Sequence, residues 1–332
     1  ANTTGAENVA VGADAGTANT TGAYNIAIGY RALDTNTTGD FNVAIGRRAL
    51  DANTTADNNT AVGASALEAN TTGAENVAVG ALALDANTTG ANVVAVGYKA
   101  LSTDTKGFGS VAIGNQALEN QNFTSNTDTF NTAVGYFAGN DITTGDRNTF
   151  VGGLAGDATD DGVGNTAVGY LALSANCGNA NVAVGIECLT VCTGSSNAAM
   201  GQDAGGSLTS GGNNLFLGYQ SGITGSPGGA QTTGSNEIFL GDENITAANI
   251  QVDWTVASDQ RDKTDFTALD LGLDFVKALA PVTYKWDKRS KYGDKTADDY
   301  DLAAQTPDGT HKEDWLDIGF KAQEVEALEI AA

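Results

Sequence analysis

A five-residue pattern of polar and apolar positions recurs along most of the chain. It consists of Asn, an aliphatic residue or Thr, Ala, an aliphatic residue and Gly, and it first appears at Asn8-Val9-Ala10-Val11-Gly12. The closing glycine returns every 17 residues as far as Gly114. After a gap of 21 residues it resumes at Gly135, continues every 16 or 17 residues to Gly218, and ends with a degenerate copy at Gly241. A period of this length predicts a solenoid in which each repeat forms one coil.

Within a repeat, the alternation of side chains predicts a short strand. Val43 and Ile45 lie two residues apart, so in a strand they share one face and Ala44 points to the other. Gly46 is expected to end the strand at a turn, because a positive φ costs little only for glycine. The pair Ala49–Leu50 predicts a second short strand. Each repeat is therefore expected to be one coil of a β-solenoid, with two strands, two turns, and a core filled by Val43 and Ile45.

Stacking such coils would align equivalent residues in columns along the axis. We expect one column of strand aliphatic residues, one of leucines, and a hydrogen-bond ladder of the asparagines that begin the strands. At ~4.8 Å per coil, about 14 coils form a rod on the order of 65 Å long. The column of alanines is expected to face away from the core and to admit another backbone, most simply identical chains around a threefold axis. A layer of small residues packed within one chain would give the same pattern.

The Asn-Val-Ala-Ile-Gly-x-x-Ala pattern resembles the head repeats of trimeric autotransporter adhesins, which form left-handed parallel β-rolls in a tight trimer. Similar repeats occur in bacteriophage tail fibres. The resemblance covers residues 1–241 and implies a left-handed coil and a homotrimer. The period of 17 is longer than such heads usually show. The extra residues are expected in the Asn-Thr-Thr-Gly turn.

The repeat ends at residue 241, and the composition of the sequence changes. Residues 242–257 are expected to be a transition that contains a strand over 250–256, and residues 258–332 a small α+β domain. In that domain the spacing of apolar residues predicts a helix over 267–280, which Pro281 ends. It also predicts strands over 282–286 and 318–322, and a helix that begins at residue 323.

Two motifs in this last part carry a second resemblance. Ser258-Asp259-Gln260-Arg261-Asp262-Lys263 and the later segment 319–326, Gly-Phe-Lys-Ala-Gln-Glu-Val-Glu, resemble the intramolecular chaperone domain of phage tailspikes and fibres, also classed as peptidase S74. Members of that family help three chains to align and fold, and then cut themselves off before the serine. They usually continue into a long C-terminal helix, so we expect the domain here to be incomplete at its C-terminus.

The resemblance implies an autoproteolytic site. Ser258 is the expected nucleophile and attacks the carbonyl carbon of Ala257. Lys263 is the expected base, if burial and the neighbouring Arg261 keep its amine neutral. Asp259 either orients that amine or caps the following segment. An exposed linker with ordinary charges is the alternative for this hexapeptide.

Composition narrows the other possibilities. The formal net charge of −24 argues against nucleic acid and anionic membranes as partners. No apolar stretch reaches the ~20 residues that a membrane-spanning helix needs. Cys177, Cys188 and Cys192 are too few for a disulfide framework, and Cys188 stands where other repeats carry alanine, which predicts a buried thiol. With His311 as the only histidine, we expect neither a metal site nor a cofactor.

Together these features favour a trimeric viral tail fibre located in the virion tail. Its expected partners are two sister chains, other tail proteins, and a host surface receptor such as a glycan or an outer-membrane component. Binding to host cells, with and without the less regular coils over 115–135 and 219–241, would locate the receptor contacts. The alternatives are a bacterial trimeric surface adhesin, a surface-polysaccharide hydrolase, for which no carboxylate pair stands out, and an ice-binding solenoid, which lacks the usual Thr-x-Thr strands.

Overall fold

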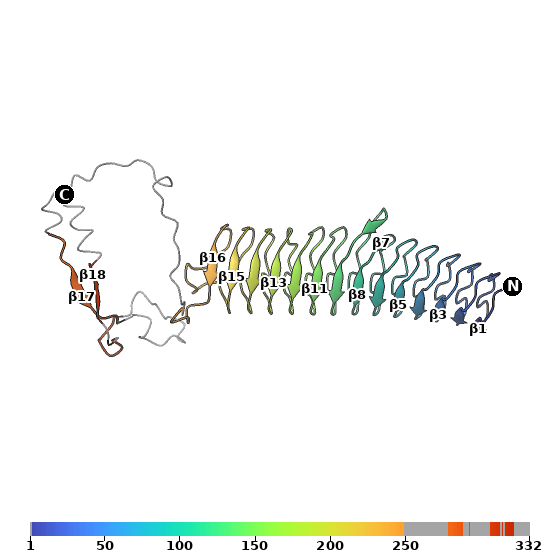
Figure 1. The fold of residues 1–332 in the computed structure, drawn as a ribbon, viewed down its shortest axis with the longest axis horizontal. Coiled ribbons are helices and arrows are strands. Elements are labelled where there is room, and N and C mark those ends of the chain that lie inside the picture. Colours follow the sequence, from blue (N-terminus) through green and yellow to red (C-terminus); the bar gives the residue numbers. More distant parts are fainter. Residues whose placement is uncertain are drawn as a thin grey trace. The chain divides into compact units, whose positions relative to one another are not determined.

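Fourteen short strands form one parallel sheet along the first part of the chain. The computed structural model describes residues 2–248, 278–287, 292, 306–312, 314 and 316–321. The chain divides into two compact units, Ala1–Ile245 and Thr246–Ala332. In the first unit the strands are hydrogen-bonded in chain order (Figure 1). They are β1 (Val9–Val11), β2 (Ile26–Ile28), β3 (Val43–Ile45), β4 (Thr60–Val62), β5 (Val77–Val79), β6 (Val94–Val96), β8 (Val111–Ile113), β10 (Thr132–Val134), β11 (Thr149–Val151), β12 (Thr166–Val168), β13 (Val182–Val184), β14 (Ala198–Met200), β15 (Leu215–Leu217) and β16 (Ile238–Leu240).

The register of this sheet confirms the repeat. Each strand pairs in parallel with the equivalent residues of the next coil, so that Val9 is opposite Ile26, and Ile26 is opposite Val43. The pairing continues across the 21-residue coil, where Val111 is opposite Thr132. The first unit is therefore a parallel β-solenoid with a period of about 17 residues, as the sequence predicts.

The inside and outside of the coil are the reverse of the prediction. Ala44 is fully buried, whereas Ile45 is 37% exposed and Val43 is partly exposed. The coil is narrow, and its interior is already occupied by the buried side chains of Ala49 and Leu50. In a coil that holds such a leucine, only a small residue fits on the inner side of the strand, so the aliphatic residues face outward. The prediction that Val43 and Ile45 fill the core was wrong, and so was the inference that the alanine column admits sister chains.

The predicted second strand of each coil is also absent from the described solenoid. The segment around Ala49 and Leu50 forms turns instead. A regular coil holds three non-glycine residues in the left-handed region, illustrated by Phe41, Arg48 and Leu50 with φ of 58°, 60° and 51°. Coils still stack through main-chain hydrogen bonds here, since Leu33 N donates to the carbonyl oxygen of Ala49 at 3.0 Å. The predicted column of leucines therefore forms, but its residues belong to turns and not to a second strand.

The repeat glycine is required for two reasons. Gly46 has a φ of 140°, which L residues rarely adopt. A Cβ at this position would also collide with the carbonyl oxygen of Gly63 in the next coil. The same geometry recurs at the closing glycines of the other regular coils. The glycine therefore turns the chain and lets the next coil stack directly on it.

The asparagines that begin the strands form the predicted ladder. Asn42 N donates to Asn25 Oδ1 at 2.9 Å, and Asn59 N donates to Asn42 Oδ1 at 3.0 Å. Asn42 Nδ2 donates to the carbonyl oxygen of Ala56 at 2.8 Å. These amides are buried, and their hydrogen bonds satisfy main-chain groups of the turns that water cannot reach.

A second ladder runs through the asparagines of the Asn-Thr-Thr triplets. Asn53 Nδ2 donates to Asn36 Oδ1 at 2.9 Å, and Asn70 Nδ2 donates to Asn53 Oδ1 at 3.0 Å. All three side chains are fully buried. Beside them, the Thr54 hydroxyl donates to the carbonyl oxygen of Thr71 at 3.0 Å. The triplets are therefore structural turn residues.

In two coils a phenylalanine replaces the strand alanine, and a glycine replaces the leucine of the same coil. Phe150 replaces the strand alanine in its coil, and Gly156 stands at the leucine position of that coil. Phe216 and Gly222 repeat this exchange. A Cβ on either glycine would collide with the phenyl ring. The ring of Phe216 stacks on Phe239 of the next coil with centroids 5.1 Å apart. Each phenyl ring thus occupies the space that a leucine side chain fills in the regular coils.

Two successive coils carry an additional pair of short strands. The strands β7 (Gly107–Phe108) and β9 (Thr127–Asp128) pair in parallel as a separate two-stranded sheet. The β7 loop stands out from the row of coils (Figure 1). Phe123 is 8% exposed and anchors the longer loop, whereas the tip at Thr124, Ser125 and Asn126 is exposed and polar.

A buried polar network fills the space beneath this loop. Asp104 stands in the column of the second ladder and accepts hydrogen bonds from Gln121 Nε2 at 2.6 Å and Gly107 N at 3.1 Å. Asn131 Nδ2 donates to Gln121 Oε1 at 2.8 Å. Burial raises the pKa of Asp104, and these hydrogen bonds oppose the rise. The network ends the second asparagine ladder, which runs through the Asn-Thr-Thr triplets.

In the second unit, β17 (Val282–Tyr284) and β18 (Asp317–Gly319) form an antiparallel pair. They confirm the two predicted strands, with the second beginning at Asp317 and ending at Gly319 instead of spanning 318–322. The predicted strand over 250–256, the helix from residue 323 and most of the helix over 267–280 lie outside the described residues.

Candidate functional site

The outer face of the fourteen-stranded sheet carries an exposed or partly exposed aliphatic side chain in every coil. We call it the outer sheet face, and it consists of the first and third residues of each strand. The third residue is Val, Ile, Leu or Met in every coil, and the first is aliphatic, Thr or Ala. Ile28 is 38% exposed, Met200 57% and Ile238 63%. Exposed apolar surfaces of this extent mark interaction sites.

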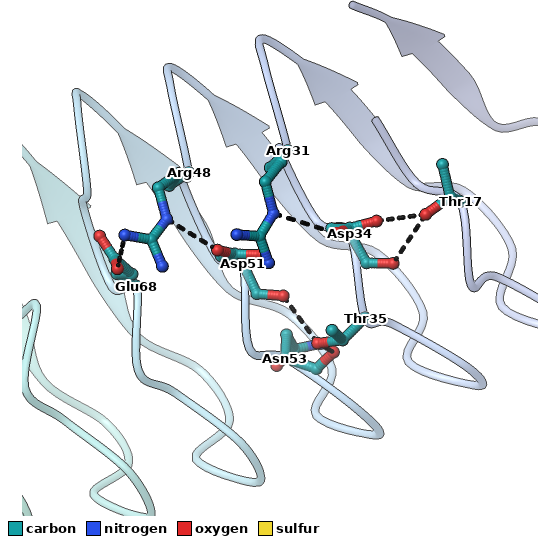
Figure 2. Close-up of polar contacts among 8 residues, drawn as sticks. All are labelled: Thr17, Arg31, Asp34, Thr35, Arg48, Asp51, Asn53 and Glu68. Atoms are coloured by element: carbon teal, nitrogen blue, oxygen red, sulfur yellow. Dashed lines mark hydrogen bonds and ion pairs between the residues drawn. The ribbon is translucent and has the colours of Figure 1, made fainter. Parts of the chain in front are cut away.

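An ion-pair ladder lines another side of the first coils (Figure 2). The guanidinium of Arg48 lies 2.9 Å from Asp51 Oδ2 in its own coil and 2.7 Å from Glu68 Oε1 in the next. Arg31 spans Asp34 and Asp51 in the same way, at 3.2 Å from each. Each arginine therefore links two successive coils.

The ladder is interrupted at Asp85. Leu82 stands at the position of this coil that corresponds to Arg31 and Arg48. The positive charge that acts on Asp85 is that of Lys99, which pairs with Glu119 at 2.9 Å. Burial raises the pKa of Asp85 to about 6, and the neighbouring Glu68 contributes. Asp85 Oδ1 is buried without a hydrogen-bond partner.

The three cysteines are free and buried, as predicted for Cys188. Burial raises the pKa of Cys188 to about 12 and that of Cys192 to about 11. Burial also raises the pKa of Cys177, against a hydrogen bond with Thr159. Thiols in this state are poor nucleophiles, so these cysteines act as small core residues.

A cavity of about 350 Å³ opens on the outer sheet face over β14, β15 and β16. Its apolar lining is Ala198, Leu215 and Ile238. Its polar lining consists of Ser196, Asn213, Asn214, Asn236 and Glu237. The pattern of the sequence did not reveal it, because it depends on one small residue in an otherwise regular column.

In the second unit, the described residues make a small polar cluster. Tyr292 Oη donates to Asp287 Oδ1 at 2.7 Å, and Gly309 N donates to Asp287 Oδ2 at 2.7 Å. The rings of Tyr292 and His311 pack edge to face with centroids 4.9 Å apart. Asp287 thus links the end of the β17 segment to the turn at Gly309.

The predicted catalytic residues Ser258, Asp259 and Lys263, and the predicted cleavage position after Ala257, lie outside the described residues. Their roles therefore remain predictions that rest on the sequence motif.

Comparison with known protein families supplies the decisive observation for this region. Residues 258–332 match the family model of peptidase S74, described as chaperone of endosialidase. The match begins at the serine that the sequence motif singled out. No curated protein and no solved structure matched the chain.

The chain thus combines a β-solenoid with a C-terminal segment similar to the S74 chaperone family. No described helix is long and apolar enough to cross a membrane. In the described part of the chain, no group of three or more His, Cys, Asp and Glu side chains is placed to hold a metal ion.

Proposed function

We propose that the chain is a trimeric viral tail fibre protein that takes part in host attachment. Residues 1–241 form the shaft, and residues 258–332 help three chains to fold together. Once the trimer has formed, a cut between Ala257 and Ser258 separates the two parts. The S74 match behind a solenoid is the single observation that carries this proposal.

The outer sheet face supports the trimer. Its apolar residues recur in every coil, although the coil's own core is already filled by alanine and leucine. A feature kept in all fourteen coils serves the whole rod and not a local ligand. Three such faces turned toward a common axis would remove their aliphatic side chains from water, at roughly 25 cal/mol per Å² of apolar surface.

The proposed cut requires only groups of the chain and one water molecule. Lys263 in its neutral form takes the proton of the Ser258 hydroxyl, and Oγ attacks the carbonyl carbon of Ala257. The bond from that carbon to Ser258 N breaks, and the nitrogen leaves with a proton as a free amine. Water then hydrolyses the resulting ester, which regenerates the hydroxyl. The Ser–Lys pair is a known variant of the serine–base arrangement.

A bacterial trimeric adhesin would share the solenoid and the outer sheet face. It would not require a chaperone of the S74 type after the repeats. The match over residues 258–332 therefore favours the fibre.

Mass spectrometry and light scattering of the full-length protein test the proposal. We expect a break between Ala257 and Ser258 in the native protein and an intact chain in Ser258→Ala and Lys263→Met. Light scattering should give three times the mass of the solenoid fragment. An intact native chain would remove the autoproteolytic role, and a stable monomer would remove the trimer.

A further inference from the structure

Two columns of side chains border the outer sheet face, one at each end of the strands. The first edge column stands immediately before the asparagine that begins each strand, as Phe41 stands before Asn42. The second edge column follows the closing glycine, as Arg47 follows Gly46. The cavity over β14 to β16 shows how close the first edge column lies to the outer sheet face, because both contribute to its lining: Ser196, Asn213 and Asn236 from the column, and Ala198, Leu215 and Ile238 from the face.

The exposed aromatic residues of the solenoid are confined to these two columns. In its described part, every exposed aromatic side chain stands at one of the two positions: Tyr24, Phe41 and Phe130 in the first edge column, and Tyr30, Tyr98, Tyr136, Tyr170 and Tyr219 in the second. Aromatic side chains are enriched at protein–protein interfaces. Their concentration beside the outer sheet face therefore widens the surface that three chains would share.

A threefold arrangement brings the two edge columns together. Three identical chains that turn their outer sheet faces toward a common axis form a closed ring, in which each contact joins two different surfaces. One edge of each face then meets the opposite edge of the next face. The first edge column of one chain would therefore lie beside the second edge column of its neighbour.

The residues of the two columns match when coils of the same number lie side by side. In that alignment, each aromatic residue of the first edge column faces a large partner: Tyr24 faces Tyr30, Phe41 faces Arg47, and Phe130 faces Tyr136. Aromatic pairs attract one another, and so do an arginine and an aromatic ring.

A shift by one coil removes most of these pairs. In one direction, two of the three aromatic residues would face Ala64 and Gly153, and in the other direction two would face Ala13 and Asn115. Either shift leaves only one of the three with an aromatic or arginine partner. The outer sheet face distinguishes these alignments poorly, since the third residue of its strands is aliphatic in every coil. The edge columns therefore carry the information that selects one alignment.

The rings in both columns lean toward the preceding coil. A Cβ added to Gly109 would lie 2.8 Å from the ring of Phe130 in the following coil. A Cβ added to Gly153 would lie 3.7 Å from the ring of Tyr170, again in the following coil. Because both columns lean in the same direction, the lean does not shift one column against the other.

We propose that the two edge columns of neighbouring chains meet in the trimer, coil beside equivalent coil, and set the alignment of the three chains. The partner is a second copy of this chain. The inference rests on the proposed trimer, and it adds which residues join the subunits and at which level they meet.

Oxidative cross-linking of tyrosines tests this alignment. With equivalent coils side by side, the only tyrosines that face each other across the edge columns are Tyr24 of one chain and Tyr30 of the next, and a shift by one coil in either direction brings no two tyrosines together. Light-driven oxidation of the full-length protein should therefore join chains through a carbon–carbon bond between these two rings. We expect covalent dimers and trimers on denaturing gels, and fragmentation of the linked peptides by mass spectrometry should locate the bond. A link within one chain would leave its mass on the gel unchanged.

Three variants provide the controls. Tyr24→Phe should lose the linked chains and remain trimeric. Phe130→Tyr added to Tyr24→Phe should restore linked chains, now between position 130 and Tyr136. Phe41→Tyr added to Tyr24→Phe should not restore them, because position 41 would face Tyr30 only after a shift by one coil.

Two results would overturn the inference. One is a trimer in which Tyr24 and Tyr30 do not link, which would leave the proposed fibre standing. The other is linked chains in Tyr24→Phe/Phe41→Tyr, which would show that neighbouring chains are shifted by one coil. Light scattering on the same samples distinguishes both from a failure of the proposed function, since a stable monomer would remove the trimer and the inference together.

Discussion

At the residue scale, the cost of an unpaired carboxylate is clearest at Asp85. The ion-pair ladder neutralises Asp34, Asp51 and Glu68 with arginines, but Asp85 has Leu82 where the arginine of its own coil would stand. Burial raises the pKa of Asp85 from 3.8 to about 6. The folded protein therefore holds this proton more tightly than the unfolded chain does.

The raised pKa of Asp85 determines whether its contribution to the free energy of unfolding rises or falls with pH. Between about pH 4 and pH 6 the folded state binds more protons than the unfolded state, so the contribution of Asp85 to the free energy of unfolding falls as pH rises. Below that window the carboxyl is neutral in both states and its burial costs little. Above it, the penalty is fully present.

Leu82→Arg should remove much of that penalty. Leu82 has a φ of 58°, like Arg31 and Arg48 with 56° and 60°, so an arginine there can adopt the geometry that already reaches the acidic residue three positions on. We expect stabilisation of about 1 kcal/mol at pH 7, because Asp85 is partly exposed and such pairs contribute little more. The gain should vanish near pH 4. Denaturant unfolding of the full chain at both pH values measures it.

Leu82→Gln is the control for this variant, since it shortens the apolar surface without adding charge. An equal shift in Leu82→Gln, or the same gain at pH 4 and pH 7, would show that Asp85 is not the cause.

The residue scale also shows what the sequence could and could not predict. The glycine turns and the asparagine ladder were predictable, because each needs one chemical property at one position. The side of the strand that points into the core, which carries Ala44, was not predictable. Alternation places Val43 and Ile45 on one side of a strand, but when both sides carry apolar residues it does not say which side is inside. The narrowness of the coil decides that, and it depends on the buried Ala49 and Leu50.

At the element scale, the turn at the end of each strand determines whether coils can stack. The closing glycine combines an unusual φ with direct contact to the glycine of the next coil. Other positive-φ positions in the coil are near 50–60° and carry ordinary side chains. The two kinds of position should therefore respond differently to the same substitution.

Gly46→Asn should destabilise the solenoid strongly. Asparagine tolerates the left-handed region but not a φ of 140°, and its Cβ would collide with the carbonyl oxygen of Gly63. Backbone strain alone costs roughly 1–3 kcal/mol, and the collision adds to it. Denaturant unfolding followed by circular dichroism measures the loss.

Gly164→Asn is the matched control. Gly164 has a φ of 69°, and a Cβ added to it would meet no other atom within 4 Å. Asn58, Asn92 and Asn213 occupy the equivalent position in other coils. We expect a change within about 0.5 kcal/mol, typical of surface substitutions. Similar losses in the two variants would mean that the stacking contact is not what requires glycine at position 46.

The 17-residue period of the sequence predicts some elements of the coil but not others. A repeat of 17 residues predicted the strand columns, because hydrogen-bonded neighbours must align. The second strand of each coil was predicted from the apolar pair Ala49–Leu50, yet that pair packs from turns with positive φ. The cavity over β14 could not be predicted from the sequence either, because its lining comes from three stacked coils.

At the scale of the whole molecule, the sequence supplied more of the evidence for the proposed function than the structure did. The two short motifs in residues 258–326 indicated the S74 family, and the family match over 258–332 agrees with them. The structure contributed the outer sheet face, which the sequence had assigned to the core. The case for a trimer therefore moves from a column of alanines to a surface of exposed aliphatic side chains.

That change gives a direct test of the assembly. In the double variant Ile28→Glu/Ile45→Glu, two carboxylates replace side chains that are 38% and 37% exposed in the single chain. A coil whose core is built from alanine and leucine should tolerate them, whereas a trimer that buries this face should not, because unpaired buried charges are costly. We expect the circular dichroism spectrum to persist while light scattering reports one chain instead of three.

Two further variants separate assembly from folding. Ala44→Glu places the same charge in the core, and we expect it to abolish the solenoid spectrum itself. Ile28→Thr/Ile45→Thr uses a residue already found on the outer sheet face at Thr60 and Thr149, and it should remain trimeric. A glutamate double variant that stays trimeric would show that the chains meet elsewhere. Loss of its solenoid spectrum together with a well-folded Ala44→Glu would reverse the assignment of inside and outside.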